Sequence, residues 1–371
     1  MKSISLNEYR DTKQYFLMLD VLIKNVASNK ESFLEENYIS PSSYRRAKND
    51  GNKIGEQILK DLSPEFNYKL VNDKFINELE ERINKIYFNI YYKIYGTYQE
   101  DINYVEDLIS MNLIIYPVLK LIKLLMLLNQ FNAPKDILET NKLLFEEVKS
   151  FYHFYNDDLK VLFEIVDVSF SNDNNALFLS KEYKNELTYY TLSTKCYLEG
   201  KYIEAIYFAN IAKKKFVENE NFKRIYYVNL TLMSTYSVLE KYQQCYELSK
   251  KQMLSLNSID NIGFEYIGAR KHYIISCLGL KKYKEIIKDL KDVSSIKYNE
   301  VICLLIAYYY ESKNNYEEYF DKVIEKLNFK IEKKNLIYRL DTFLKKKDKN
   351  FLNYVNDTVL PTALLNILKK M

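Results

Sequence analysis

The sequence predicts an all-α protein, and three observations support this fold class. The chain has 371 residues, but only 7 are glycine and 5 are proline, whereas hairpin-rich β-proteins need many turns built from these residues. Apolar residues recur at helical spacing along most of the chain. In the second half, the helical segments also arrive in pairs. A hydrophobic fraction of 47% with 28% charged residues is that of a folded globular protein.

Residues 8 to 62 have the pattern of a small helical unit. The apolar side chains of its first helix form one stripe, made of Tyr15, Phe16, Leu19, Leu22, Ile23 and Val26. A last helix, from residue 52 to 62, presents an apolar face made of Ile54, Ile58 and Leu62. We therefore expect a small helical unit that is separate from the rest of the chain.

Two short helices with a tight connection are predicted between these two. A capping-box pattern around Asn29 begins the first, which runs to about Glu36. After a three-residue connection, Ser40 and Pro41 begin the second, because they have the residue types of an N-cap and a first-turn proline. A short helix, a three-residue turn and a helix with Ser and Arg near its start have the spacing of a helix-turn-helix motif.

The second short helix is the predicted DNA-contacting element. We expect Tyr44 and Ala47 to pack inward and the polar side chains to face DNA, because Arg suits guanine edges and phosphates. The candidate DNA-binding residues are Ser40, Ser42, Ser43, Arg45, Arg46 and Lys48. Nearby Glu35, Glu36 and Asp50 dilute the positive charge. The alternative is an ordinary helical cap with a solvated arginine pair.

A repeat of helical hairpins is visible in the second half of the chain. In residues 187 to 215, Gly200 lies in a short turn and Tyr202 follows two residues later. Small residues on the second helix let the two helices approach closely; they are Ala205, Ala209 and Ala212. The same frame fits three later segments, with the aromatic residue at Tyr242, Tyr283 and Tyr316. This pattern resembles the tetratricopeptide repeat (TPR), which has a period of about 34 residues.

The sequence therefore predicts two domains. Residues 1–63 form a helix-turn-helix-like N-terminal unit, and residues 64–371 form a TPR-like helical-repeat domain, an α-solenoid. This two-part order resembles the peptide-responsive transcription regulators of Gram-positive bacteria, the PlcR, PrgX and Rgg group, with the Rap proteins as relatives that lack the DNA-binding unit. The resemblance implies a quorum-sensing regulator, usually a homodimer, whose solenoid binds a short signalling peptide on its concave face. A protein-binding scaffold or anti-activator without DNA binding is the alternative.

Candidate peptide-binding residues follow from the hairpin frame. The first helix of each TPR-like hairpin lines the concave surface, so the exposed positions of these helices are the candidates. They are Tyr190, Thr194 and Tyr197 in the first repeat, Tyr227, Asn229 and Ser234 in the second, Lys271 in the third, and Tyr308 and Glu311 in the fourth. Asn and Tyr can hydrogen-bond a peptide backbone, and Tyr adds flat apolar area.

Nothing in the sequence favours an enzyme, a cofactor or a metal site. The two histidines, His153 and His272, are far apart, and no common catalytic or nucleotide-binding motif occurs. We expect His272, beside Lys271 and Arg270, to be a surface histidine. The cysteines are too widely spaced to indicate zinc or a disulfide framework, and core thiols are expected; they are Cys196, Cys245, Cys277 and Cys303. The net charge of +4 is too small to indicate nucleic-acid binding by itself.

The sequence also predicts a cytoplasmic location. The N-terminal residues lack the apolar segment of a signal peptide. The most hydrophobic stretch, Leu113 to Leu128, is shorter than a membrane span and contains two lysines, so a buried helix is expected. The expected partners are DNA and a short signalling peptide or a partner protein, in a homodimer that does not contact a membrane.

Overall fold

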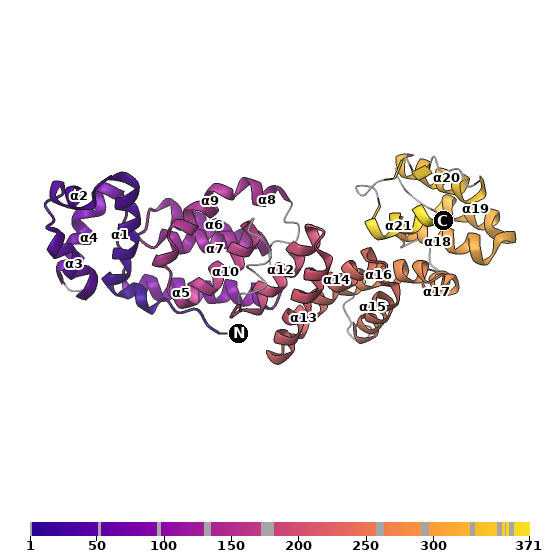
Figure 1. Ribbon diagram of the computed structural model, residues 1–371, viewed down its shortest axis with the longest axis horizontal. Coiled ribbons are helices and arrows are strands. Elements are labelled where there is room, and N and C mark those ends of the chain that lie inside the picture. Colours follow the sequence, from indigo (N-terminus) through magenta and orange to yellow (C-terminus); the bar gives the residue numbers. More distant parts are fainter. Residues whose placement is uncertain are drawn as a thin grey trace. The chain divides into compact units, whose positions relative to one another are not determined.

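The computed structural model is helical throughout the residues that it describes (Figure 1). These are residues 2–50, 53–94, 98–129, 135–171, 182–256, 263–290, 297–326, 331–346, 351–352, 354–355 and 360–371. Among them no strand occurs, and Lys69 and Leu113 form an isolated parallel bridge. The predicted all-α class is confirmed. The chain divides into two compact units, Met1–Lys195 with Lys214–Arg224 and Cys196–Lys213 with Ile225–Met371.

Four helices begin the first unit, shown in indigo in Figure 1: α1 (Thr12–Val26), α2 (Lys30–Glu36), α3 (Pro41–Asp50) and α4 (Lys53–Phe66). Their buried faces pack on one another, and the side chains at the centre are Phe16, Leu19, Ile23, Tyr44, Ala47, Leu59 and Leu62. The two predicted short helices are therefore present. The predicted start of the last helix at Asn52 lies outside the described residues.

Two residues assigned to the apolar faces of this unit are exposed instead. Val26 is 64% exposed because it is the last residue of α1, beyond the point where the helix is covered. Ile54 is 42% exposed because the buried face of α4 begins at Gly55 and continues through Ile58. The apolar stripe of each helix was thus predicted one turn too long at one end.

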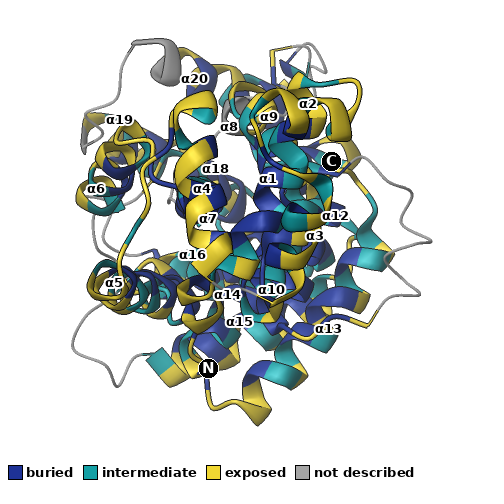
Figure 2. Cartoon of the chain, turned by 90° about the vertical axis from the view of Figure 1, so that its left-hand side faces the viewer, coloured by how far each residue is buried: buried dark blue, intermediate teal, exposed yellow. Residues whose placement is uncertain are grey.

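The rest of the first unit contains α5 (Asp73–Tyr91), α6 (Tyr98–Ser110), α7 (Tyr116–Asn129), α8 (Lys135–Thr140), α9 (Lys142–Ser150) and α10 (Asp157–Phe170). The hydrophobic stretch of the sequence becomes α7, and the predicted buried helix is confirmed. Its buried residues include Val118, Leu119, Leu121, Ile122, Leu124, Leu125 and Met126. Most of the other helices bury only one face, as the division into dark blue and yellow shows in Figure 2.

The remaining helices come in pairs: α12 (Glu186–Leu198) and α13 (Tyr202–Glu218), α14 (Phe222–Val238) and α15 (Tyr242–Leu256), α16 (Phe264–Gly279) and α17 (Tyr283–Asp289), α18 (Tyr298–Glu311) and α19 (Tyr316–Lys326), then α20 (Ile331–Lys346) and α21 (Thr362–Lys370). The helices α12, α13 and α14 contribute residues to both compact units, and the later ones belong to the second unit.

Three of these hairpins are closed by the same turn. The central residues Gly200, Glu240 and Lys281 have φ values of 77°, 58° and 59°. In each turn, the N–H of the next residue donates at 2.8 Å to a carbonyl near the end of the preceding helix, to Cys196, Tyr236 and Cys277 respectively. This is the left-handed helix C-cap, in which backbone hydrogen bonds satisfy the last carbonyl groups. The next helix then begins at the tyrosine of the repeat frame, so the same backbone recurs where the frame recurs.

The four cysteines are buried free thiols, so the prediction of core thiols is confirmed. Cys245, Cys277 and Cys303 belong to the hydrophobic core of the second unit. Burial raises the pKa of Cys245 to about 11 and that of Cys277 to about 12. These thiols are therefore protonated at neutral pH and act as small apolar side chains.

Candidate functional site

The connection between α2 and α3 is a tight turn fixed by its own backbone. Tyr38 adopts a φ of 60°, and the N–H of the next residue, Ile39, donates to the carbonyl of Leu34 at 2.8 Å. Ile39 is buried, which anchors the turn in the core of the four helices. The Ser40 Oγ then accepts from the N–H of Ser43 at 3.1 Å. Because this hydrogen bond caps α3, the second helix begins at once.

The two faces of α3 have different environments. Tyr44 and Ala47 point inward and are buried, as predicted. The opposite face is an exposed stripe of polar side chains, Ser42, Arg45, Arg46 and Asn49. Their spacing of three and four residues places them on one side of the helix. Serine, arginine and asparagine are residue types that contact phosphates and base edges, so this stripe could meet DNA.

An acidic residue of α1 connects the helices beneath this stripe. Asp20 accepts hydrogen bonds from the ammonium groups of Lys30 and Lys48, the latter at 2.5 Å. It also accepts from the Tyr44 hydroxyl at 3.0 Å. Burial by itself raises the pKa of Asp20, but the two lysine hydrogen bonds and charges outweigh it and hold the pKa below its ordinary value of 3.8. The carboxylate is therefore ionised at neutral pH.

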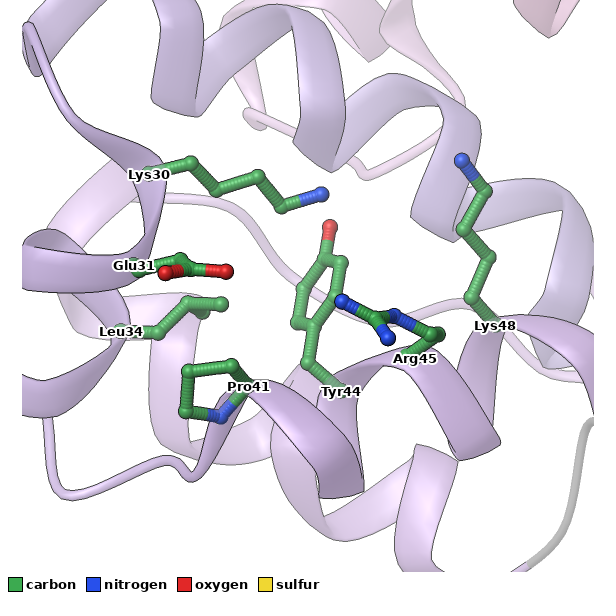
Figure 3. A pocket seen from close by; sticks show the side chains of 7 residues that line it. All are labelled: Lys30, Glu31, Leu34, Pro41, Tyr44, Arg45 and Lys48. Carbon is green, nitrogen blue, oxygen red and sulfur yellow. The ribbon is translucent and has the colours of Figure 1, made fainter.

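A shallow hollow of about 210 Å³ lies between α2 and α3. It is lined by Lys30, Glu31, Leu34, Pro41, Tyr44, Arg45 and Lys48, and Figure 3 shows the Lys30 ammonium directed toward the Tyr44 hydroxyl. The Lys30 nitrogen lies 4.2 Å from the centre of the Tyr44 ring. Three cations and one carboxylate line this hollow, so it is basic.

The six candidate DNA-binding residues divide into two groups. Ser42, Arg45 and Arg46 are exposed on the outer face of α3, where a partner could reach them. The other three have intramolecular roles: Ser40 is the N-cap of α3, Ser43 hydrogen-bonds it, and Lys48 pairs with Asp20. The sequence indicated the capping role of Ser40 but not the ion pair of Lys48, because Asp20 is 28 residues away from Lys48.

Polar side chains on the first helices of three hairpins lie close together. Tyr197 of α12 is near Ser234 of α14, and the Ser234 Oγ lies 3.0 Å from Nε2 of His272 on α16. The Nδ1 of the same imidazole is 3.4 Å from Ser237 Oγ, which in turn lies 3.1 Å from Cys245 Sγ. The structure thus brings together two predicted peptide-binding residues, Tyr197 and Ser234, and adds His272.

His272 is half-buried, and both of its ring nitrogens lie near serine hydroxyls of α14, so the expected surface histidine has polar partners in the fold. Burial, with a smaller contribution from the positive charge of Lys271, lowers the pKa of His272 from 6.5 to about 3. The imidazole is therefore neutral at physiological pH, with one nitrogen able to donate and the other able to accept. So low a pKa makes it a poor general base for either serine.

Two other peptide-binding candidates are buried, contrary to the expectation that they line an open surface. The Tyr227 hydroxyl donates to Glu265 at 3.0 Å, and its ring stacks on Phe264. Asn229 is 7% exposed, and its Oδ1 has no hydrogen-bond partner among the described residues. Phe264 and Glu265 both belong to α16, so this helix packs on Tyr227 and covers it.

The candidates of the later hairpins lie at the surface or partly buried. Lys271 is exposed on α16. Tyr308 stacks on Tyr319, and Glu311 is exposed and forms an ion pair with Lys284 at 3.4 Å. Tyr308 and Glu311 therefore each have a partner on a neighbouring helix, which the repeat frame did not predict.

The remaining two candidates, Tyr190 and Thr194, belong to the first compact unit. The ring of Tyr190 faces the guanidinium of the buried Arg224 at 5.4 Å. The Thr194 hydroxyl donates to the carbonyl of Tyr190 at 3.2 Å, within the same helix. Both residues are half-buried and thus have structural contacts of their own.

Three residues of these sites were missed at the level of sequence. Asn49 could have been found, because it follows Arg46 by three residues on the same helical face. Asp20 offered a weaker signal, a charge beside the apolar stripe of α1. For His272 there was no signal, since Ser234 lies 38 residues away and only packing brings the two together.

Comparisons with models of protein families, with curated proteins and with solved structures find no match to this chain. In the described part of the chain, no helix combines the length and apolar character needed to cross a membrane. The described side chains also contain no group of three or more His, Cys, Asp or Glu residues that could hold a metal ion. Fold and site geometry define an all-helical protein with a small N-terminal unit of four helices and a series of paired helices.

Proposed function

We propose that this chain is a peptide-sensing transcription regulator of the cytoplasm. It binds DNA through the helix-turn-helix-like unit of residues 1–63 and a short peptide on the first helices of a TPR-like solenoid. In this respect it resembles the PlcR, PrgX and Rgg group. It acts as a homodimer, because helix-turn-helix proteins commonly use paired units to bind two half-sites.

The exposed stripe of α3 is the observation that carries the DNA-binding part. Arg45, Arg46 and Asn49 project from a helix that a tight turn joins to α2, while Tyr44 fixes the helix from the other side. Arginine and asparagine form bidentate hydrogen bonds with guanine and adenine edges. A rigid helix whose outer face offers these groups supports insertion into the major groove.

The linked polar side chains of the second unit support the peptide-binding part. Tyr197, Ser234 and His272 come from three successive first helices and carry uncharged donors and acceptors. Such groups match the amide and carbonyl groups of a peptide without a large desolvation cost. A peptide that bound several first helices at once would favour one spacing of the helices over another, which is the basis of a population shift.

The experiment is a salt titration of binding to labelled DNA from upstream of the gene. The variant Arg45→Ala/Arg46→Ala is compared with Lys74→Ala/Lys85→Ala, which removes the same charge from exposed positions of α5. The arginine variant should bind more weakly, and the slope of log affinity against log salt should fall by about two. The lysine variant should bind like the native protein.

Two outcomes would favour the alternative of a protein-binding scaffold without DNA binding. One is a folded native protein that does not bind the DNA at low salt. The other is an equal loss of affinity in the two variants, which would show general charge attraction and no defined interface. In either case the four N-terminal helices would be an accessory unit of the repeat domain.

A further inference from the structure

We infer that Asp20 is an internal counterion of the proposed DNA-binding unit, which reduces the contribution of Lys30 and Lys48 to phosphate binding. This inference rests on the proposed function. It identifies a residue that limits the affinity of the N-terminal unit for DNA. Asp20 is a positioning residue here, since it acts through the two lysines.

The geometry joins three helices through one carboxylate. Asp20 lies on α1, Lys30 is the first residue of α2, and Lys48 lies in the last turn of α3. The two carboxylate oxygens are divided between the lysines: Oδ1 accepts from Lys30 and from Tyr44, and Oδ2 accepts from Lys48. Both ammonium groups are thus directed toward Asp20.

The two lysines are nevertheless within reach of a ligand. Their side chains are 41% and 35% exposed, and the Asp20 side chain is 28% exposed. A DNA phosphate is an anionic oxygen acceptor like the carboxylate, so the two compete for the same ammonium groups. Asp20 brings one negative charge against the two positive charges of the lysines. The three groups together therefore displace about one condensed counterion of the DNA fewer than the two lysines would without Asp20.

Local charge leads to the same conclusion. Around the hollow, the cations Lys30, Arg45 and Lys48 are opposed by the carboxylates of Asp20 and Glu31. Changing Asp20 to Asn removes one negative charge and leaves an amide oxygen to accept from Tyr44. The packing that fixes α3 on α1 remains, because the Phe16 and Tyr44 rings contact edge to face with centroids 5.0 Å apart.

The test measures binding of the full chain to a labelled duplex of scrambled sequence over a range of salt concentrations. Asp20→Asn should bind several-fold more tightly than the native protein at low salt, with a slope steeper by about one. The matched control Asp61→Asn removes an exposed carboxylate from α4 and should change the slope little. Asp20→Asn/Lys30→Gln/Lys48→Gln should lose the gain.

If Asp20→Asn does not fold, as judged by the loss of its helical circular-dichroism signal, single lysine variants still test the inference. In the native background, Lys30→Gln or Lys48→Gln should lower the slope by less than Arg45→Ala, which should lower it by about one. Two results would overturn the role of Asp20 and leave the proposed function intact: equal slopes for Asp20→Asn and Asp61→Asn, or a slope that falls as far in either lysine variant as in Arg45→Ala. A native protein that binds no DNA would overturn the proposed function and this inference with it.

Discussion

The guanidinium of Arg224 closes the C-terminal end of α5, because its Nε donates to the carbonyl oxygen of Tyr91 at 3.0 Å. It also donates to the carbonyl of Ile90, and Asn221 donates to Tyr91 at 2.9 Å. The last carbonyls of a helix have no partner within the helix, and a cation there also complements the helix dipole. Arg224 is 1% exposed, so protein groups alone satisfy this helix end.

Replacing Arg224 by Met should therefore destabilise the first unit strongly. The variant removes the charged hydrogen bonds that the carbonyls of Ile90 and Tyr91 accept, and we expect a loss of about 3 kcal/mol in the free energy of unfolding, measured by urea denaturation. Lys85→Met, which removes an exposed cation from the same helix α5, is the control and should have little effect. Equal stability of the two variants would contradict this role of Arg224.

His272 should make the stability of the second unit depend on pH. Its pKa is about 3 in the folded chain against 6.5 for the free side chain, so the unfolded chain takes up the proton first. The stabilisation is complete above pH 6.5 and decreases as the pH falls toward 3, by at most about 1.4 kcal/mol per pH unit.

The measurement compares the free energy of unfolding at about pH 7 and about pH 5, which limits the contribution of carboxylates. His272→Gln should lose less stability over this interval than the native protein. His153→Gln changes an exposed histidine and should retain the native pH dependence. If all three proteins respond equally, the imidazole of His272 is not held neutral by the fold.

Close helix packing at Gly279 should make this position intolerant of a larger residue. A Cβ atom there would lie 2.5 Å from the Tyr242 ring, whose base cannot move without shifting α15. Gly279→Ala should lower the free energy of unfolding by about 2 kcal/mol through overpacking, despite the better helix propensity of alanine.

Gly268 provides the matched comparison for this prediction. A Cβ at Gly268 would lie 2.8 Å from the Cδ2 atom of Leu230, the far end of a flexible side chain. Gly268→Ala should therefore cost less than Gly279→Ala in thermal denaturation. The opposite order would show that α16 adjusts more easily at its end than in its middle.

Two substitutions of Ser40 distinguish a role in capping α3 from a direct role in DNA binding. Because its Oγ caps α3, Ser40→Ala should cost about 1 kcal/mol in stability. Ser40→Asp restores a capping oxygen and should keep the stability, but its negative charge should weaken DNA binding. Amide hydrogen exchange of α3 and the DNA titration measure the two effects. Unchanged DNA affinity in Ser40→Asp would place the start of α3 away from the phosphates.

Local patterns in the sequence determined the helices of this protein and several of their ends. Scarce glycine and proline with helical periodicity were enough for the all-α class, and Ser40 with Pro41 marked the start of α3 correctly. The turns at Gly200, Glu240 and Lys281 recur as the repeat frame implied. These features depend on neighbours within a few residues, so the chain itself carries the information.

Only the tertiary structure decided which faces of these helices are covered and which charges are paired. The sequence assigned Tyr227 and Asn229 to an open surface, but both are buried, and α16 contacts Tyr227. It also counted Lys48 as a free cation, whereas α1 supplies Asp20 as its partner. Helical spacing fixes which side chains share a face, but it does not determine which helix packs on that face. Burial and ion pairing therefore depend on contacts between residues far apart in the chain.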